Sequence, residues 1–194
     1  MSKLKLVMAT TADGVTALGP DDPMDWTGSD DKRAFRLLTS VGGVLGAGRR
    51  TFERLPVLKG RVVRCLSTRK GYVNNAEARI ALEAGPVLGE MKVSDAAYVQ
   101  TITLGSFAHQ HPDGWLIGGQ TVALEALAIG LIGEVFMCRS PMSVNDMVPH
   151  MRTGDTFWPQ RDQITPRLRH NEAWKQTDTC RIGDTVIEVW RRRP

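Results

Sequence analysis

The sequence lacks any hydrophobic run that approaches the roughly 20 residues needed to span a membrane. Its first residues, MSKLKLVMATTADG, contain two lysines and a single four-residue apolar run, which is too short for the core of a signal peptide. We therefore expect a cytoplasmic protein that does not enter a membrane. The same residues predict a first strand that ends in a turn at Asp13-Gly14.

Cysteine is also scarce. The sequence has three, Cys65, Cys138 and Cys180, which are widely spaced and form no CxxC pair. This number and spacing indicate neither a disulfide framework nor a zinc site. His109 and His111 lie close together in a predicted loop, but no third ligand is evident, so we predict no metal site.

Aromatic residues make up only 6% of the 194 residues, and the net charge of +4 is dispersed. The densest basic run, Arg191–Arg193, is expected to be a solvated tail. Single-stranded nucleic acids bind to aromatic side chains interleaved with basic ones, so the composition argues against a nucleic-acid partner. A basic balance instead suits a small anionic ligand. We expect a monomer.

What the sequence does contain is an alternation of apolar, strand-like runs with helical patterns. Residues 15–26, rich in Gly, Pro and Asp, are expected to form an irregular loop. The other expected strands and helices lie within residues 4–14, 29–40, 41–48, 49–56, 60–68, 77–85 and 113–140, before a hairpin that ends at 193. This order predicts one α/β domain over residues 1–194, with three layers: a central mixed, mostly parallel sheet with a C-terminal antiparallel hairpin, and flanking helices.

Two adjacent carboxylates lie at the start of the first expected helix, where Ser29 can cap its N-terminus. Helical spacing places Asp31 on the same face as Phe35 and Leu38. Asp30 is rotated from it by about 100° and is expected to face solvent. The structural alternative is that both acids only stabilise the helix N-terminus, by roughly 0.3–1 kcal/mol each.

Three polar or glycine-rich stretches follow apolar strands: LGAGRRTFE at 45–53, CLSTRKG at 65–71 and LIGGQTVALEAL at 116–127. None is a GxGxxG fingerprint or a P-loop, and each alone is a weak signal, because a glycine pair after a strand more often reflects tight packing than a ligand site. Ligands of α/β sheets bind at the carboxyl ends of strands. Three such ends in one small domain therefore favour a nucleotide cofactor.

The order of these pieces resembles the dihydrofolate reductase family. The likeness is carried by DW with Asp31 five residues later and then Phe35, and by GRRTFE, LKGRVVRCLST, WLIGGQTVALEAL and TGDTFWP. It covers roughly residues 4–69, 115–139 and 152–192. Cys138 stands where that family usually has a threonine that hydrogen-bonds the pocket carboxylate.

The resemblance implies an NADPH-dependent oxidoreductase that reduces 7,8-dihydrofolate to tetrahydrofolate. Asp31 would hold the pterin ring and help to protonate its N5, Trp26 would order a water beside it, and Arg61 would clamp the glutamate carboxylate of the folate. The implied substrate-binding residues are Met8, Ala9, Asp31, Phe35, Leu55, Leu58, Arg61 and Ile117. The implied NADPH-binding residues are Ala9, Gly48, Arg49, Arg50, Thr51, Leu66, Ser67, Thr68, Arg69, Gly118, Gly119, Gln120, Thr121 and Thr156.

Two other functions stay open. A related reductase, such as the pyrimidine reductase of riboflavin synthesis, acts on a ribosylated, phosphorylated aminopyrimidine. A non-catalytic nucleotide-binding or structural module would retain the fold without turnover.

Overall fold

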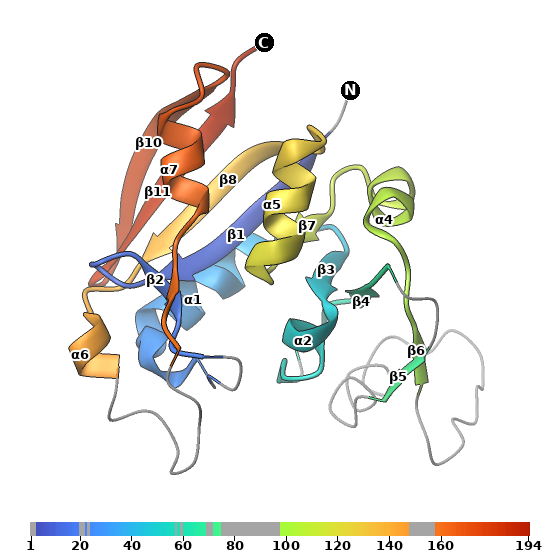
Figure 1. Ribbon diagram of the computed structural model, residues 1–194, viewed down its shortest axis with the longest axis horizontal. Helices are drawn as coiled ribbons and strands as arrows, with labels where there is room; N and C mark the ends of the chain where they lie inside the picture. Colours follow the sequence, from blue (N-terminus) through green and yellow to red (C-terminus); the bar gives the residue numbers. More distant parts are fainter. Residues whose placement is uncertain are drawn as a thin grey trace. The chain divides into compact units, whose positions relative to one another are not determined.

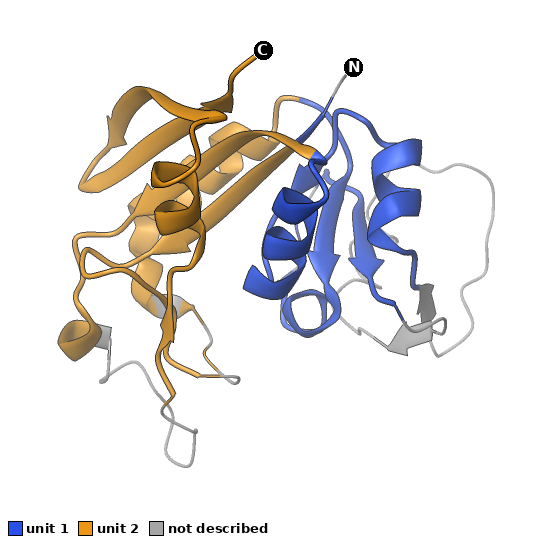
Figure 2. Ribbon diagram, turned by 45° about the horizontal axis from the view of Figure 1, so that its top comes forward, with its two compact units in different colours: residues 1–4, 42–131 blue, residues 5–41, 132–194 orange. Residues whose placement is uncertain are grey.

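The computed structural model describes residues 3–19, 22, 24–56, 58, 60–68, 72–74, 98–147 and 158–194. The chain forms two compact units (Figure 2). Unit 1 comprises Met1–Leu4 and Gly42–Leu131, and unit 2 comprises Lys5–Val41 and Ile132–Pro194. No helix among the described residues is both long and apolar enough to cross a membrane.

Four strands of unit 2 lie side by side in the order β10-β11-β8-β1 (Figure 1). Their bounds are Leu4–Thr10 for β1, Ile132–Arg139 for β8, Trp174–Ile182 for β10 and Thr185–Arg192 for β11. Strand β11 pairs antiparallel with both β10 and β8. The apolar run of β1 is buried along most of its length, as expected for a strand covered on both faces.

The predicted C-terminal hairpin is present as β10 and β11, but it is longer than expected. Arg191 and Arg192 are exposed as expected, but they lie within β11 and not in a tail. Arg191 donates a hydrogen bond from Nε to Oε1 of Glu134 on β8 at 2.7 Å. The basic run therefore extends β11, which pairs with β8 up to Arg191.

Unit 2 contains six further elements among the described residues. They are β2 (Val15–Ala17), the 3-10 helix η1 (Asp25–Thr27), α1 (Gly28–Thr39), α6 (Val144–Met147), β9 (Gln160–Arg161) and α7 (Ile164–Arg169). The loop expected between residues 15 and 26 contains β2, which pairs antiparallel with β9. Its partner lies more than 140 residues away, so no local sequence pattern could indicate this pairing.

Unit 1 contains three parallel strands in the order β7-β3-β4. The bounds in this unit are β3 (Leu45–Gly48), α2 (Arg49–Phe52), β4 (Val63–Leu66), β5 (Tyr72–Asn74), β6 (Tyr98–Gln100), α4 (Leu104–Gln110), β7 (Trp115–Leu116) and α5 (Gln120–Ala128). Strand β3 is buried throughout. A Cβ on Gly46 would lie only 2.9 Å from the ring of Phe107, so only glycine lets α4 approach this strand so closely.

Parallel strands, antiparallel C-terminal strands and flanking helices confirm the predicted mixed α/β architecture. The helix predicted over 77–85 lies outside the described residues, as do Arg69 and Thr156.

Candidate functional site

Helix α1 begins at Gly28, directly after η1, and its N-cap residue is Thr27, not Ser29 as expected. The first turn carries the two acids. Asp31 is buried, with only 8% of its surface exposed, and Ala34 is buried three residues later on the same face. The predicted orientation of Asp31 toward the interior is therefore confirmed.

Burial raises the pKa of the Asp31 carboxyl from its ordinary value of 3.8 to about 6. It outweighs a hydrogen bond with Thr27 and the charge of Lys32, which both lower the pKa. Cys138, on β8, is also buried. Burial and the charge of Asp31 both raise the pKa of its thiol, so Cys138 stays a neutral thiol at neutral pH.

The hydrogen bond between Thr27 and Asp31 lowers the pKa of the carboxyl, but burial has the larger effect. Oγ1 of Thr27 also donates to the carbonyl oxygen of Met24 at 3.1 Å, which ties this residue to the loop before α1. We call Asp31, Thr27 and Cys138 the carboxylate site.

Trp26 does not have the role predicted for it. The indole Nε1 donates to Oδ2 of Asp22 at 3.0 Å, and an indole has no second hydrogen-bonding group. It is therefore not available to order a water beside Asp31. Asp22 also accepts from the backbone N–H groups of Leu18 at 2.6 Å and Met24 at 2.7 Å, so this buried carboxylate and Trp26 together hold the loop that precedes α1.

Asp30 does not simply face solvent either. Its Oδ2 accepts a hydrogen bond from the backbone N–H of Asp184 at 3.0 Å, across 154 residues of sequence. Gly183, in the turn between β10 and β11, packs against the same carboxylate. Asp30 therefore fastens the C-terminal hairpin to α1.

In unit 1, the carboxyl ends of two parallel strands bring the predicted phosphate ligands together. Gly48 at the end of β3 is in register with Leu66 at the end of β4. The residues that follow each strand line a hollow of about 450 Å³, which we call the cationic pocket. Its lining residues are Arg49, Arg50, Glu53, Ser67 and Thr68.

Four of those five residues were predicted to bind NADPH, and Glu53 was not. Its Oε1 lies 2.8 Å from Nε of Arg49, so it neutralises one of the two arginines. The four-residue spacing in RRTFE is the sequence signal for this pair. Arg50 keeps the pocket positively charged.

The glycine pair before α5 packs against the start of α2. The N–H of Gly48 donates to the carbonyl oxygen of Gly118 at 3.3 Å. Gly119 has φ of 80° and caps α5, and a Cβ added there would lie 3.4 Å from Oγ1 of Thr51. A Cβ on Gly48 would meet Val122 at 2.9 Å. Close packing thus explains these glycines, while Gln120 and Thr121 form the first turn of α5 beside them.

The predicted substrate residues divide evenly between the two units. Met8, Ala9, Asp31 and Phe35 belong to unit 2, and Leu55, Leu58, Arg61 and Ile117 belong to unit 1. Ala9 packs against the apolar cluster of Val15, Leu18 and Trp26. Leu66, predicted to contact the cofactor, is buried in unit 1.

No family model and no curated protein matches this chain. The solved structures that resemble it include the following two. A diaminohydroxyphosphoribosylaminopyrimidine deaminase/5-amino-6-(5-phosphoribosylamino)uracil reductase from Thermotoga maritima has a TM-score of 0.66 and 17% identity, over 99% of this chain and 57% of that one. RibD from Acinetobacter baumannii has a TM-score of 0.61 and 18% identity, over 100% and 59%.

The chain therefore spans less than two thirds of the length of either structure. At this level of identity the likeness shows the fold. The predicted dihydrofolate reductase-like fold is thus confirmed, and membership of the dihydrofolate reductase family itself stays a prediction.

Proposed function

We propose that this protein is an NADPH-dependent reductase of a small molecule that contains a nitrogen heterocycle, with Asp31 handling the proton that accompanies the hydride. The observation that carries this proposal is a buried carboxyl group with a pKa of about 6. A general acid works best when its pKa lies near the working pH, because it then holds a proton and can still release it. Asp31 meets that condition, whereas an ordinary solvated aspartate does not.

The cationic pocket fits the phosphate groups of the proposed cofactor. Arginine and hydroxyl groups are strong donors to phosphate oxygens, and both are present at the ends of β3 and β4. Its volume of about 450 Å³ falls within the range of small-molecule sites. NADPH supplies the hydride when it is bound. The protein's part is to hold its phosphates at Arg50, Ser67 and Thr68.

The first candidate substrate is a phosphoribosylated aminopyrimidine. It is supported by the fold comparison, since one neighbour is named for both a deaminase and a 5-amino-6-(5-phosphoribosylamino)uracil reductase. Zinc-dependent deaminases of nucleobases carry a CxxC pair among their metal ligands, and this sequence has none. Of the two activities in that name, the reductase is therefore the one that suits this chain.

The second candidate substrate is 7,8-dihydrofolate, which Asp31 favours. The N5 of this substrate must take up a proton at neutral pH, and a single buried acid on the first turn of α1 is suited to supplying one. The sequence resemblance also places Arg61 as a partner for the glutamate carboxylate of folate, a geometry for which a guanidinium is well matched.

One assay tests the proposal and separates the substrates. The purified chain is mixed with NADPH and either 7,8-dihydrofolate or 5-amino-6-(5-phosphoribosylamino)uracil, and the loss of NADPH absorbance is followed. We expect oxidation with one of the two. Arg50→Gln should raise KM for NADPH about tenfold by removing a charged hydrogen bond, with little change in kcat.

Arg36→Gln is the matched control, because Arg36 is an exposed arginine on α1 outside the cationic pocket. It should leave KM for NADPH unchanged. NADPH binding without oxidation in the presence of either substrate would contradict the reductase proposal and favour a non-catalytic nucleotide-binding module.

A further inference from the structure

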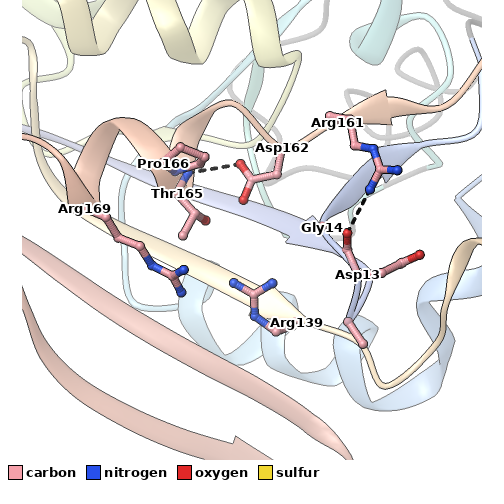
Figure 3. A pocket seen from close by; sticks show the side chains of 9 residues that line it. Asp13, Gly14, Arg139, Arg161, Asp162, Thr165, Pro166 and Arg169 are labelled. Atoms are coloured by element: carbon pink, nitrogen blue, oxygen red, sulfur yellow. Dashed lines mark hydrogen bonds between the residues drawn. The ribbon is translucent and has the colours of Figure 1, made fainter.

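Besides the cationic pocket of unit 1, the structure has a hollow in unit 2. None of the residues discussed above as candidate site residues lines it. It has a volume of about 520 Å³ (Figure 3). The turn after β1, the end of β8, strand β9 and helix α7 form its walls. Its lining residues are Ala12, Asp13, Gly14, Arg139, Arg161, Asp162, Thr165, Pro166 and Arg169. We call it the arginine hollow.

Three guanidinium groups line this hollow, and their donors are only partly used. Arg139 is held through Nε by Oε1 of Glu188 at 3.2 Å, and its terminal nitrogens face the hollow (Figure 3). Arg161 donates from Nη1 to the carbonyl oxygen of Asp13 at 3.2 Å. Arg169 has no ion pair or hydrogen-bond partner on its side chain among the residues that the structure describes. Each guanidinium has five N–H donors, so most of these donors have no protein partner in the part of the chain that the structure describes.

A buried hydroxyl group points to a ligand independently. Thr165 is 4% exposed, and within the described part of the chain its Oγ1 has no hydrogen-bond partner. Figure 3 shows this oxygen directed into the hollow, on the side of Arg139. An unsatisfied buried polar group costs about 1–3 kcal/mol, a cost that a bound acceptor would remove.

The two aspartates of the hollow are engaged by the backbone. Oδ1 of Asp162 accepts the N–H groups of Ile164 at 2.8 Å and Thr165 at 3.1 Å. Oδ2 of Asp13 accepts the N–H of Val144 at 3.2 Å. These carboxylates hold the walls in place. Glu188 neutralises Arg139 in the same way that Glu53 neutralises Arg49, so the donors of the three arginines, more than an excess of charge, are what the hollow offers to a ligand.

We propose that the arginine hollow binds the phosphate group of a small phosphorylated molecule. Several guanidinium groups and a hydroxyl, coming from different elements, suit the oxygens of a tetrahedral dianion. A hollow of about 520 Å³ has room for an organic part beside the phosphate, since sites for small molecules span roughly 300–1,000 Å³. This proposal does not depend on the reductase activity.

Calorimetric titration of the full chain with glucose 6-phosphate, inorganic phosphate and glucose tests it, without cofactor or reductase substrate. We expect the two phosphates to bind and glucose not to bind. Tighter binding of glucose 6-phosphate would show that the organic part is held too, and equal binding would assign the site to free phosphate.

Arg169→Gln should weaken glucose 6-phosphate binding about tenfold by removing a charged hydrogen bond. Arg167→Gln, at an exposed arginine of the same helix that does not line the hollow, makes the same charge change and should bind as the wild type does. Thr165→Val should also weaken binding. It should not lower the free energy of unfolding without ligand, because it removes a hydroxyl that has no partner.

Absence of phosphate binding to the wild type would overturn the proposal. Equal weakening by Arg169→Gln and Arg167→Gln would also overturn it, because the effect would then be general electrostatic attraction. Full affinity in Thr165→Val would remove the hydroxyl from the site and refute the arrangement proposed here.

Discussion

Replacing Asp31 with asparagine is expected to stabilise this protein at neutral pH while removing the proposed reductase activity. Asp31 is buried on α1 with only 8% of its surface exposed, and its pKa is raised to about 6. At neutral pH the folded chain therefore carries a carboxylate in a place that disfavours the charge. Asparagine has nearly the same shape and no charge to bury.

The magnitude follows from the two pKa values. In the unfolded chain Asp31 titrates near its ordinary value of 3.8, and in the folded chain near 6. Between these values the folded state binds the proton more tightly, so the free energy of unfolding falls as the pH rises. Above pH 6 the loss is complete at about 3 kcal/mol, from 1.36 kcal/mol per pH unit. Below pH 3.8 both states are protonated and the loss disappears.

The assay is urea unfolding of wild type and Asp31→Asn across this pH range. The variant should be more stable by up to about 3 kcal/mol above pH 6, and the difference should vanish on acidification below pH 4. Asp30→Asn is the matched control. It makes the same change one residue earlier and keeps an oxygen that can accept the Asp184 N–H, so it should not reproduce the gain.

If the free energy of unfolding differed between wild type and Asp31→Asn by the same amount from acidic to neutral pH, the gain would not arise from the ionisation of Asp31, and this prediction would be wrong. The turnover of the variant is measured separately. If the variant shows the predicted gain in stability and retains wild-type turnover, the burial argument is correct and the proton-handling role is wrong.

Two further predictions concern the surroundings of these acids. Gly183→Ala should lower the free energy of unfolding, measured by urea unfolding, by about 1–3 kcal/mol. The reason is that φ at Gly183 is 56° and the new Cβ would overlap the Asp30 carboxylate. Gly60→Ala is the control: φ there is 73° but nothing lies within 4 Å of the added Cβ, so the loss should be smaller. Cys138→Thr should add a hydroxyl donor to the surroundings of Asp31 and lower its pKa, since a donor favours the carboxylate. The fall of kcat/KM with rising pH should then move to lower pH; an unchanged pH profile would show that a hydroxyl at position 138 does not reach Asp31.

The elements that the sequence predicted well are those whose pattern is local. The apolar run of β1, the helical spacing of α1 and the alternation in β11 each repeat over seven or more residues. Strands β2 and β9 contain three and two residues, and each depends on a partner from the other end of the chain. No repeat of that length can be recognised in a sequence.

The candidate sites divide in the same way. That Arg50, Ser67 and Thr68 line one pocket was predictable, because the carboxyl ends of adjacent parallel strands lie together. The hydrogen bond between Trp26 and Asp22 was not, since it depends on how a loop without regular period folds back on itself. The arginine hollow was equally hidden, because its walls come from four separate elements.

The two acids at the start of α1 show why residue type and position in a helix do not determine function alone. Asp30 and Asp31 share a turn and the favourable field of the helix N-terminus. Asp30 meets a backbone N–H from the turn of the C-terminal hairpin, which gives its charge a partner. Asp31 is buried, and its burial outweighs the hydrogen bond with Thr27 and the charge of Lys32. Its pKa is therefore raised to about 6, so it still holds a proton near neutral pH, as the proposed proton-delivering role requires.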